Sequence, residues 1–249
     1  MNGIFTGFWL VEAVPEWNGE KVHILHEEII LSKEENGIER MTPSKLQYLF
    51  DVEHPLNQFE QYAEFIERSL KSEVGRYEKM AAEFDEEDQE SFWDWHIDEV
   101  SLYRSDFPNI LRSSLLTSMY SFVESKLVAL CHPTESGRTF SKRSSSRKPL
   151  INKARDYLIT ELNVAFPVDT PAWKFIQNTN RIRNCLVHSG GDVSAFRSER
   201  KLRNIIADME YVMIDQRDKI ILDETFCLAF IDHSFVLLSA LYNVQIEEQ

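Results

Sequence analysis

The chain is poor in cysteine and glycine, and these shortages exclude several classes of protein. Only three of its 249 residues are cysteine. They are Cys131, Cys185 and Cys227, which form no CxxC pair, so neither a disulfide framework nor a zinc ribbon is expected. The segments GxxxxGK and GxGxxG do not occur, which argues against a nucleotide-binding loop.

Features of secreted and membrane proteins are also missing. The first ten residues have no basic segment followed by a long apolar run, so no signal peptide is expected. The most apolar stretch, Phe226 to Tyr242, carries Asp232 and His233 in its middle, which is costly in lipid. We therefore expect a core helix, no membrane, and a cytoplasmic protein.

Metal-ligand patterns are weak. His23 and His26 share a helix face only if their segment is helical, and no further cluster with ligand spacing accompanies them. We expect no metal and no cofactor.

The charge is unevenly distributed along the chain. Residues 1–100 hold 24 acidic and 8 basic side chains, whereas the whole chain has a net charge of −14. The remainder is slightly basic, and its positive charge is concentrated between Arg138 and Arg155, where no acidic residue occurs. Because it lacks any acidic residue, this basic stretch favours contact with an RNA backbone. The alternative is a flexible, serine-rich loop whose charges balance the acidic half of the chain. We divide the chain into an acidic region of unknown function, 1–104, and a domain, 105–249.

Apolar spacing predicts a mainly α fold with a small β-hairpin before the last helix. Residues 1–50 show some β character. Helices are expected from His54-Pro55 past Met80, over 92–100, from Asp106 to Cys131, over 149–162, from Thr170-Pro171 towards His188, from 192 or 194 to about 208, and from Glu224 to about 245. In the first of these, the predicted apolar face is Phe59, Tyr62, Phe65, Ile66 and Leu70.

One segment combines groups suited to RNA cleavage. Arg183-Asn184-Cys185-Leu186-Val187-His188 places a cation, an amide and an imidazole near a helix end that Ser189-Gly190-Gly191 is expected to terminate. A guanidinium suits phosphate oxygens, and an imidazole gives or takes a proton near neutral pH. Attack of a 2′-hydroxyl on the adjacent phosphate needs both functions and no metal. The plain alternative is a helix C-terminal cluster favoured by the helix dipole.

This segment resembles the Arg-x4-His motif of the HEPN superfamily, in its Arg-Asn-x3-His form. An apolar helix carrying Glu124 lies upstream, and a hairpin and a terminal helix follow, as in stand-alone bacterial members. The resemblance implies a HEPN-like helical bundle that acts as a metal-independent endoribonuclease at a homodimer interface, as a toxin or a phage-defence effector with a possible antitoxin or regulatory protein. It also implies catalytic roles for three residues: Arg183 holds and neutralises the scissile phosphate, His188 transfers the proton, and Asn184 orients the phosphate or the histidine. The alternative is a HEPN-type module that binds RNA or protein without cutting.

Helix geometry complicates this site. Positions five apart lie about 140° from each other around a straight α-helix, so Arg183 and His188 do not converge, whereas Arg181, Asn184 and His188 do. Either His188 lies past the helix end or the site is shared between two copies. Arg181 is therefore a further expected phosphate contact, and the expected RNA-backbone contacts in the basic stretch are Lys142, Arg143, Arg147 and Lys148.

Overall fold

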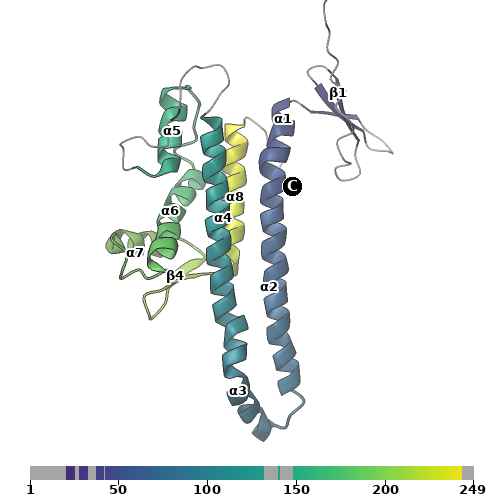
Figure 1. Ribbon diagram of the computed structural model, residues 1–249, viewed down its shortest axis with the longest axis vertical. Helices are drawn as coiled ribbons and strands as arrows, with labels where there is room; N and C mark the ends of the chain where they lie inside the picture. Colours follow the sequence, from purple (N-terminus) through teal and green to yellow (C-terminus); the bar gives the residue numbers. More distant parts are fainter. Residues whose placement is uncertain are drawn as a thin grey trace, which may run out of the picture.

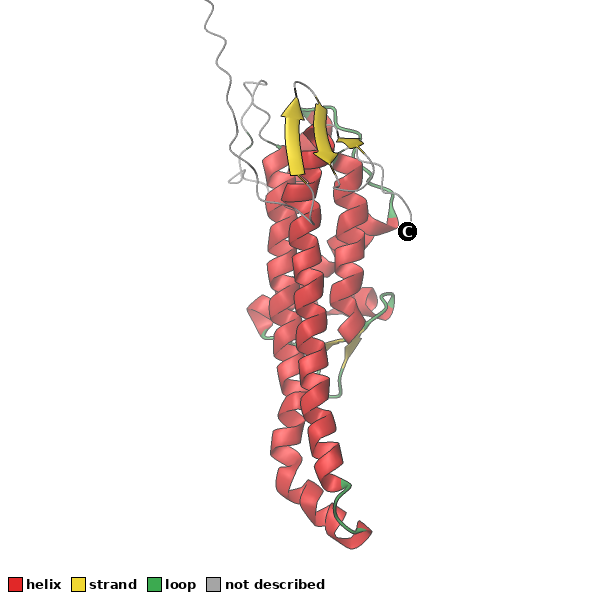
Figure 2. Cartoon of the chain, turned by 90° about the vertical axis from the view of Figure 1, so that its right-hand side faces the viewer, coloured by secondary structure: helices red, strands yellow, loops and turns green. Residues whose placement is uncertain are grey.

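Helices form an elongated bundle in this computed structural model (Figures 1 and 2). The structure describes residues 21–25, 28–32, 38–41, 43–131, 140 and 148–242. The helices are α1 (Pro43–Tyr48), α2 (His54–Ala81), α3 (Glu86–Ser101), α4 (Phe107–Leu130), α5 (Leu150–Thr160), α6 (Pro171–Ser189), α7 (Glu199–Ala207) and α8 (Glu224–Leu241), with π-helical segments at Leu49–Glu53 and Leu102–Asp106. The strands are β1 (Lys21–Leu25), β2 (Glu28–Ser32), β3 (Ile38–Met41), β4 (Val212–Ile214) and β5 (Ile220–Leu222). The predicted mainly α fold with a hairpin before the last helix is confirmed.

The first strands explain the β character expected in residues 1–50. β1, β2 and β3 form an antiparallel sheet in that order. His23 lies in β1, so its segment is a strand and the helical face required for pairing with His26 does not form. His26 itself lies outside the described residues.

A long helical hairpin gives the molecule its length. α2 runs along most of the bundle, and the chain then returns through α3 and the π-helical segment into α4 (Figure 1). Three acidic residues occupy the first turn of α3, where the helix dipole favours negative charge. Pro108 lies in the first turn of α4, as predicted, because proline lacks the backbone N–H that an interior position requires.

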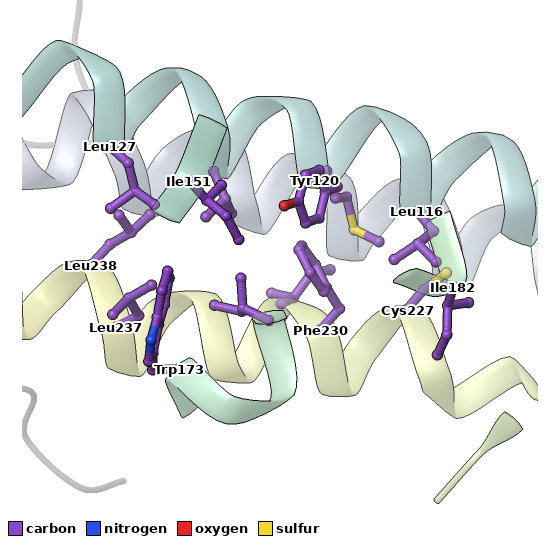
Figure 3. Packing of buried hydrophobic residues seen from close by; sticks show 14 of the residues in the cluster. Leu116, Tyr120, Leu127, Ile151, Trp173, Ile182, Cys227, Phe230, Leu237 and Leu238 are labelled. Carbon is purple, nitrogen blue, oxygen red and sulfur yellow. The ribbon is translucent and has the colours of Figure 1, made fainter. Parts of the chain in front are cut away.

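The main core lies between α4 and α8. Leu116, Tyr120 and Leu127 of α4 face Phe230 and Leu238 of α8, and the two rows are at most 1% exposed (Figure 3). α6 adds Trp173, Ile176 and Ile182 to the same cluster. Within the described residues, α8 is the one helix long and apolar enough to cross a membrane. Its packing against α2, α4 and α6 agrees with the predicted core helix.

The predicted apolar face of α2 is partly right. Phe59 is half-buried and packs edge-on against Phe122 of α4, with the two ring centres 5.9 Å apart. Tyr62 is 51% and Phe65 is 59% exposed, whereas Ala63 between them is buried. Periodicity therefore found the face that meets the bundle and added two exposed aromatic residues to it.

The core also crosses the proposed boundary between residues 104 and 105. Tyr48, Val52, Leu56 and Ala63 belong to the same buried cluster as Leu116 and Tyr120 of α4. The boundary falls within the helical run that joins α3 to α4. The core therefore continues across this position, and the division of the chain into an acidic region and a domain remains a prediction.

Aspartates shape the turn of the β4–β5 hairpin and a turn between α6 and α7. Asp215 Oδ1 accepts from the backbone N–H groups of Arg217 and Lys219 at 2.8 and 2.7 Å, which shapes the predicted turn. Asp192 Oδ1 accepts from Ser194 Oγ and from the N–H of Ala195, so residues 192–195 form a turn. The helix expected to begin there begins later, at Glu199.

His233 on α8 should make stability depend on pH. Its ring lies 4.3 Å from that of Phe175 on α6, and burial lowers its pKa below the ordinary 6.5, although Asp232 opposes this. The unfolded chain then takes up a proton before the folded one does, so the free energy of unfolding should fall as the pH drops below about 6.5. His233→Phe should flatten this fall in denaturant titrations between pH 7.5 and 5.5. If exposed His54→Gln flattens it equally, His233 is not the responsible group.

Candidate active site

Helix α6 positions the Arg-Asn-x3-His segment. The Thr170 hydroxyl caps the helix start by accepting from the N–H of Trp173 at 3.3 Å. The helix continues without interruption to Ser189 and ends at Gly190, whose φ of 56° is the left-handed conformation that glycine adopts readily. Both predicted helix ends are confirmed. His188 therefore lies inside the last turn, and the possibility that it lies past the helix end is excluded.

The motif residues face in different directions around α6. Ile182 and Cys185 are buried in the core, whereas His188 is exposed. Because the helix is regular between Arg183 and His188, the two side chains leave it about 140° apart. A single copy of the chain thus separates its guanidinium from its imidazole.

A chain of hydrogen bonds holds the part-buried Arg183. Its Nη1 donates to Asn184 Oδ1 at 3.1 Å, Asn184 Nδ2 donates to Asn180 Oδ1 at 3.2 Å, and Asn180 Nδ2 donates to the Tyr120 hydroxyl at 2.5 Å. The guanidinium also lies 5.5 Å from the centre of the Tyr120 ring. Burial raises the pKa of Tyr120, and the nearby charge of Glu124 raises it further, so this phenol stays protonated. Asn184 therefore orients Arg183, whereas a contact with the phosphate or with His188 was expected.

One nitrogen of Arg183 has no partner within the described part of the chain. Its Nε is buried and makes no hydrogen bond there. A buried N–H without an acceptor is costly, and an acceptor from outside the chain reaches this nitrogen only if the guanidinium moves, because the atom is closed to solvent. Phosphate oxygens are suitable acceptors for a guanidinium.

Tyr120 and Asn180 are site residues that the sequence did not reveal. Asn180 lies four residues before Asn184, which is the spacing of neighbours on a helix face, and this was the available signal. Tyr120 is 60 positions away from Asn180 and appeared only as one of many apolar residues of its helix.

A polar cavity opens on another side of α6. It has a volume of about 550 Å³, lies between α5, α6 and α7, and is lined by Arg181 and Asn184 among others. Arg183 and His188 do not line it. Of the predicted site residues, Arg181 and Asn184 thus line this cavity, Arg183 is hydrogen-bonded to Asn184, and His188 leaves α6 in another direction.

The basic stretch is only partly described. Lys142, Arg143 and Arg147 lie outside the described residues. Lys148 is exposed and pairs with Asp156 at 2.7 Å, and Arg155 pairs with the same carboxylate. The first acidic residue after the stretch therefore neutralises part of its charge.

Thiol and metal chemistry find no support among the described residues. Cys131, Cys185 and Cys227 are buried and unpaired, and burial raises the pKa of each thiol, to about 12, 11 and 12 respectively. Groups of three or more histidine, cysteine or acidic side chains able to hold a metal ion are absent from the part of the chain that the structure describes.

Comparison with known proteins assigns no role to these residues. No family model, curated protein or solved structure matches this chain.

Proposed function

We propose that the protein is a metal-independent endoribonuclease of HEPN type whose active site forms between two copies of the chain. One observation carries this proposal: the last turns of α6 hold a hydrogen-bonded guanidinium with a buried, unpartnered Nε and, on another side, an exposed imidazole. The two groups have the chemistry of RNA transesterification, and the helix separates them by about 140°. A homodimer brings the imidazole of one copy to the guanidinium of the other.

The roles of the residues follow from their surroundings. Arg183 binds the scissile phosphate and neutralises the charge that develops on it. His188 transfers the proton between the 2′-hydroxyl, the leaving 5′-oxygen and solvent. Asn184 and Asn180 are positioning residues, because they connect Arg183 to Tyr120. The basic stretch around Lys142, Arg143, Arg147 and Lys148 contacts the RNA backbone.

The resemblance of the motif supports a cytoplasmic toxin or phage-defence effector, with an antitoxin or another regulatory protein as a possible partner. A second candidate is a non-catalytic HEPN-type module that binds RNA or protein. The separation of Arg183 from His188 within one chain favours it, since one copy alone presents a cationic surface without a complete catalytic pair.

The test is incubation of the purified full-length protein with single-stranded RNA in EDTA, followed by analysis of the product ends. Fragments with 2′,3′-cyclic phosphate and 5′-hydroxyl ends are expected, because the 2′-hydroxyl is the nucleophile. RNA binding without cleavage would reject the nuclease and favour the binding module. Cleavage that EDTA abolishes would contradict the metal-independent mechanism.

A further inference from the structure

The polar cavity beside α6 has the dimensions of a nucleotide site. Its volume of about 550 Å³ is within the range of small-molecule pockets, roughly 300–1,000 Å³. Asn184 lines the cavity and also accepts a hydrogen bond from Arg183. A ligand in the cavity therefore touches the residue that orients the proposed phosphate-binding guanidinium.

Side-chain amides form much of the polar lining. They belong to Asn152, Gln177, Asn178, Asn180 and Asn184. Each amide carries both donors and acceptors, which is the combination that the edge of a nucleobase presents. The amides of Gln177 and Asn152 lie 2.9 Å apart, and Asn180 bonds both Asn184 and Tyr120, so the lining is held in place before a ligand arrives.

The charge of the cavity favours an anion. Arg181 from α6 and Lys201 from α7 line it, and none of the described lining residues is a carboxylate. Neither cation makes an ion pair with any residue that the structure describes, whereas Arg203 on α7 pairs with both Glu199 and Asp218. Two unpaired cations in a concave site suit a phosphate group.

The remaining lining is apolar and includes an aromatic ring. Phe196 and Ile205 lie on one side, and Pro149 and Ile151 on another. Nucleobases stack readily on such surfaces when an RNA strand is unpaired. Pro149 also follows directly on the basic stretch that ends with Arg147 and Lys148.

We infer that this cavity binds one nucleotide of a single-stranded RNA, with the base against Phe196 and the amides and a phosphate between Arg181 and Lys201. The inference rests on the proposed function for the identity of the strand. It places a base-reading site next to the cleavage site, so the enzyme selects the nucleotide near which it cuts.

The experiment is calorimetric titration of the full-length protein with AMP, GMP, CMP, UMP and inorganic phosphate. At least one mononucleotide is expected to bind about tenfold or more tightly than inorganic phosphate, because stacking and amide contacts add to the phosphate contact. Equal affinity for inorganic phosphate, or no mononucleotide binding, would overturn the inference.

Substitutions of the lining residues test whether the mononucleotide binds in this cavity. Arg181→Gln and Lys201→Gln are each expected to weaken mononucleotide binding about tenfold. The matched control, Lys174→Gln, removes an exposed charge from α6 outside the cavity and should leave the affinity unchanged. Phe196→Leu should weaken mononucleotide binding and leave the binding of inorganic phosphate as it was.

Two further outcomes separate this inference from the proposed function. A single-stranded RNA tetramer should displace the mononucleotide; failure to displace it would assign the cavity to a free nucleotide and reject the RNA subsite. If the tetramer displaces the mononucleotide but the protein cuts no RNA, the nuclease is rejected and the RNA subsite is kept. If the protein cuts RNA and neither Arg181→Gln nor Lys201→Gln changes its KM for RNA, the subsite is rejected and the nuclease is kept.

Discussion

His188→Ala is expected to slow RNA cleavage by about 10²- to 10⁴-fold, the usual contribution of one proton-transfer group. The substitution should leave the unfolding midpoint nearly unchanged, because His188 is exposed on the last turn of α6. The measurement is single-turnover cleavage of a labelled RNA, with the unfolding curve of each variant recorded in parallel.

The matched control is His54→Ala, which removes another exposed histidine at the start of α2. It should cleave at the wild-type rate. Cleavage by His188→Ala at the same rate as His54→Ala would remove His188 from the mechanism. RNA affinity provides a second readout, because loss of a proton-transfer group leaves binding largely intact.

Arg112→Ala is expected to lower the free energy of unfolding by about 3 kcal/mol, the largest expected effect on stability. Arg112 Nε and Nη2 donate to the two carboxylate oxygens of Glu67 at 2.6 and 2.9 Å, and Nη1 donates to the Leu222 carbonyl at 2.8 Å. The side chains of Arg112 and Glu67 are only 16% and 14% exposed. Removing the guanidinium leaves a part-buried carboxylate and a carbonyl without their partner.

Chemical denaturation compares the free energy of unfolding of Arg112→Ala with that of a control variant, Arg76→Ala. Arg76 pairs with Glu73 on the exposed side of α2, at 3.0 Å, and its loss should destabilise the protein far less, because solvent screens the pair. Equal destabilisation by the two variants would show that burial of the Arg112 pair is unimportant.

The Arg112 pair also joins α2 to α4 and β5, so a deletion of residues 1–100 would remove part of the core together with the acidic charge.

The order of the helices was predictable because each helix has a local signal. Thr170 with Pro171 and Gly190 mark the ends of α6 through properties of single residues, and the structure places both ends there. Pro108 lies in the first turn of α4, but the chain is already helical at that point, because α3 continues into α4 through the π-helical segment. The packed face of α2 was predictable from periodicity only in part, because the exposed ring of Phe65 and the buried methyl group of Ala63 are both apolar.

The site was predictable only as far as one helix extends. The spacing of Arg183 and His188 indicated that they diverge, and the regular α6 keeps them apart. Tyr120 and Lys201 joined the site from α4 and α7, and contacts between distant segments leave no pattern within either segment. The hydrogen-bond chain and the cavity therefore required coordinates.

The most direct measurement mixes Arg183→Ala with His188→Ala protein under conditions in which subunits exchange. In a site shared by two copies, a heterodimer keeps Arg183 of one chain opposite His188 of the other, so one of its two sites is complete. Random exchange should then restore about one quarter of the wild-type cleavage rate to two variants that are inactive alone. A mixture that exchanges subunits, shown by mass spectrometry, yet stays as inactive as either variant would contradict the shared site.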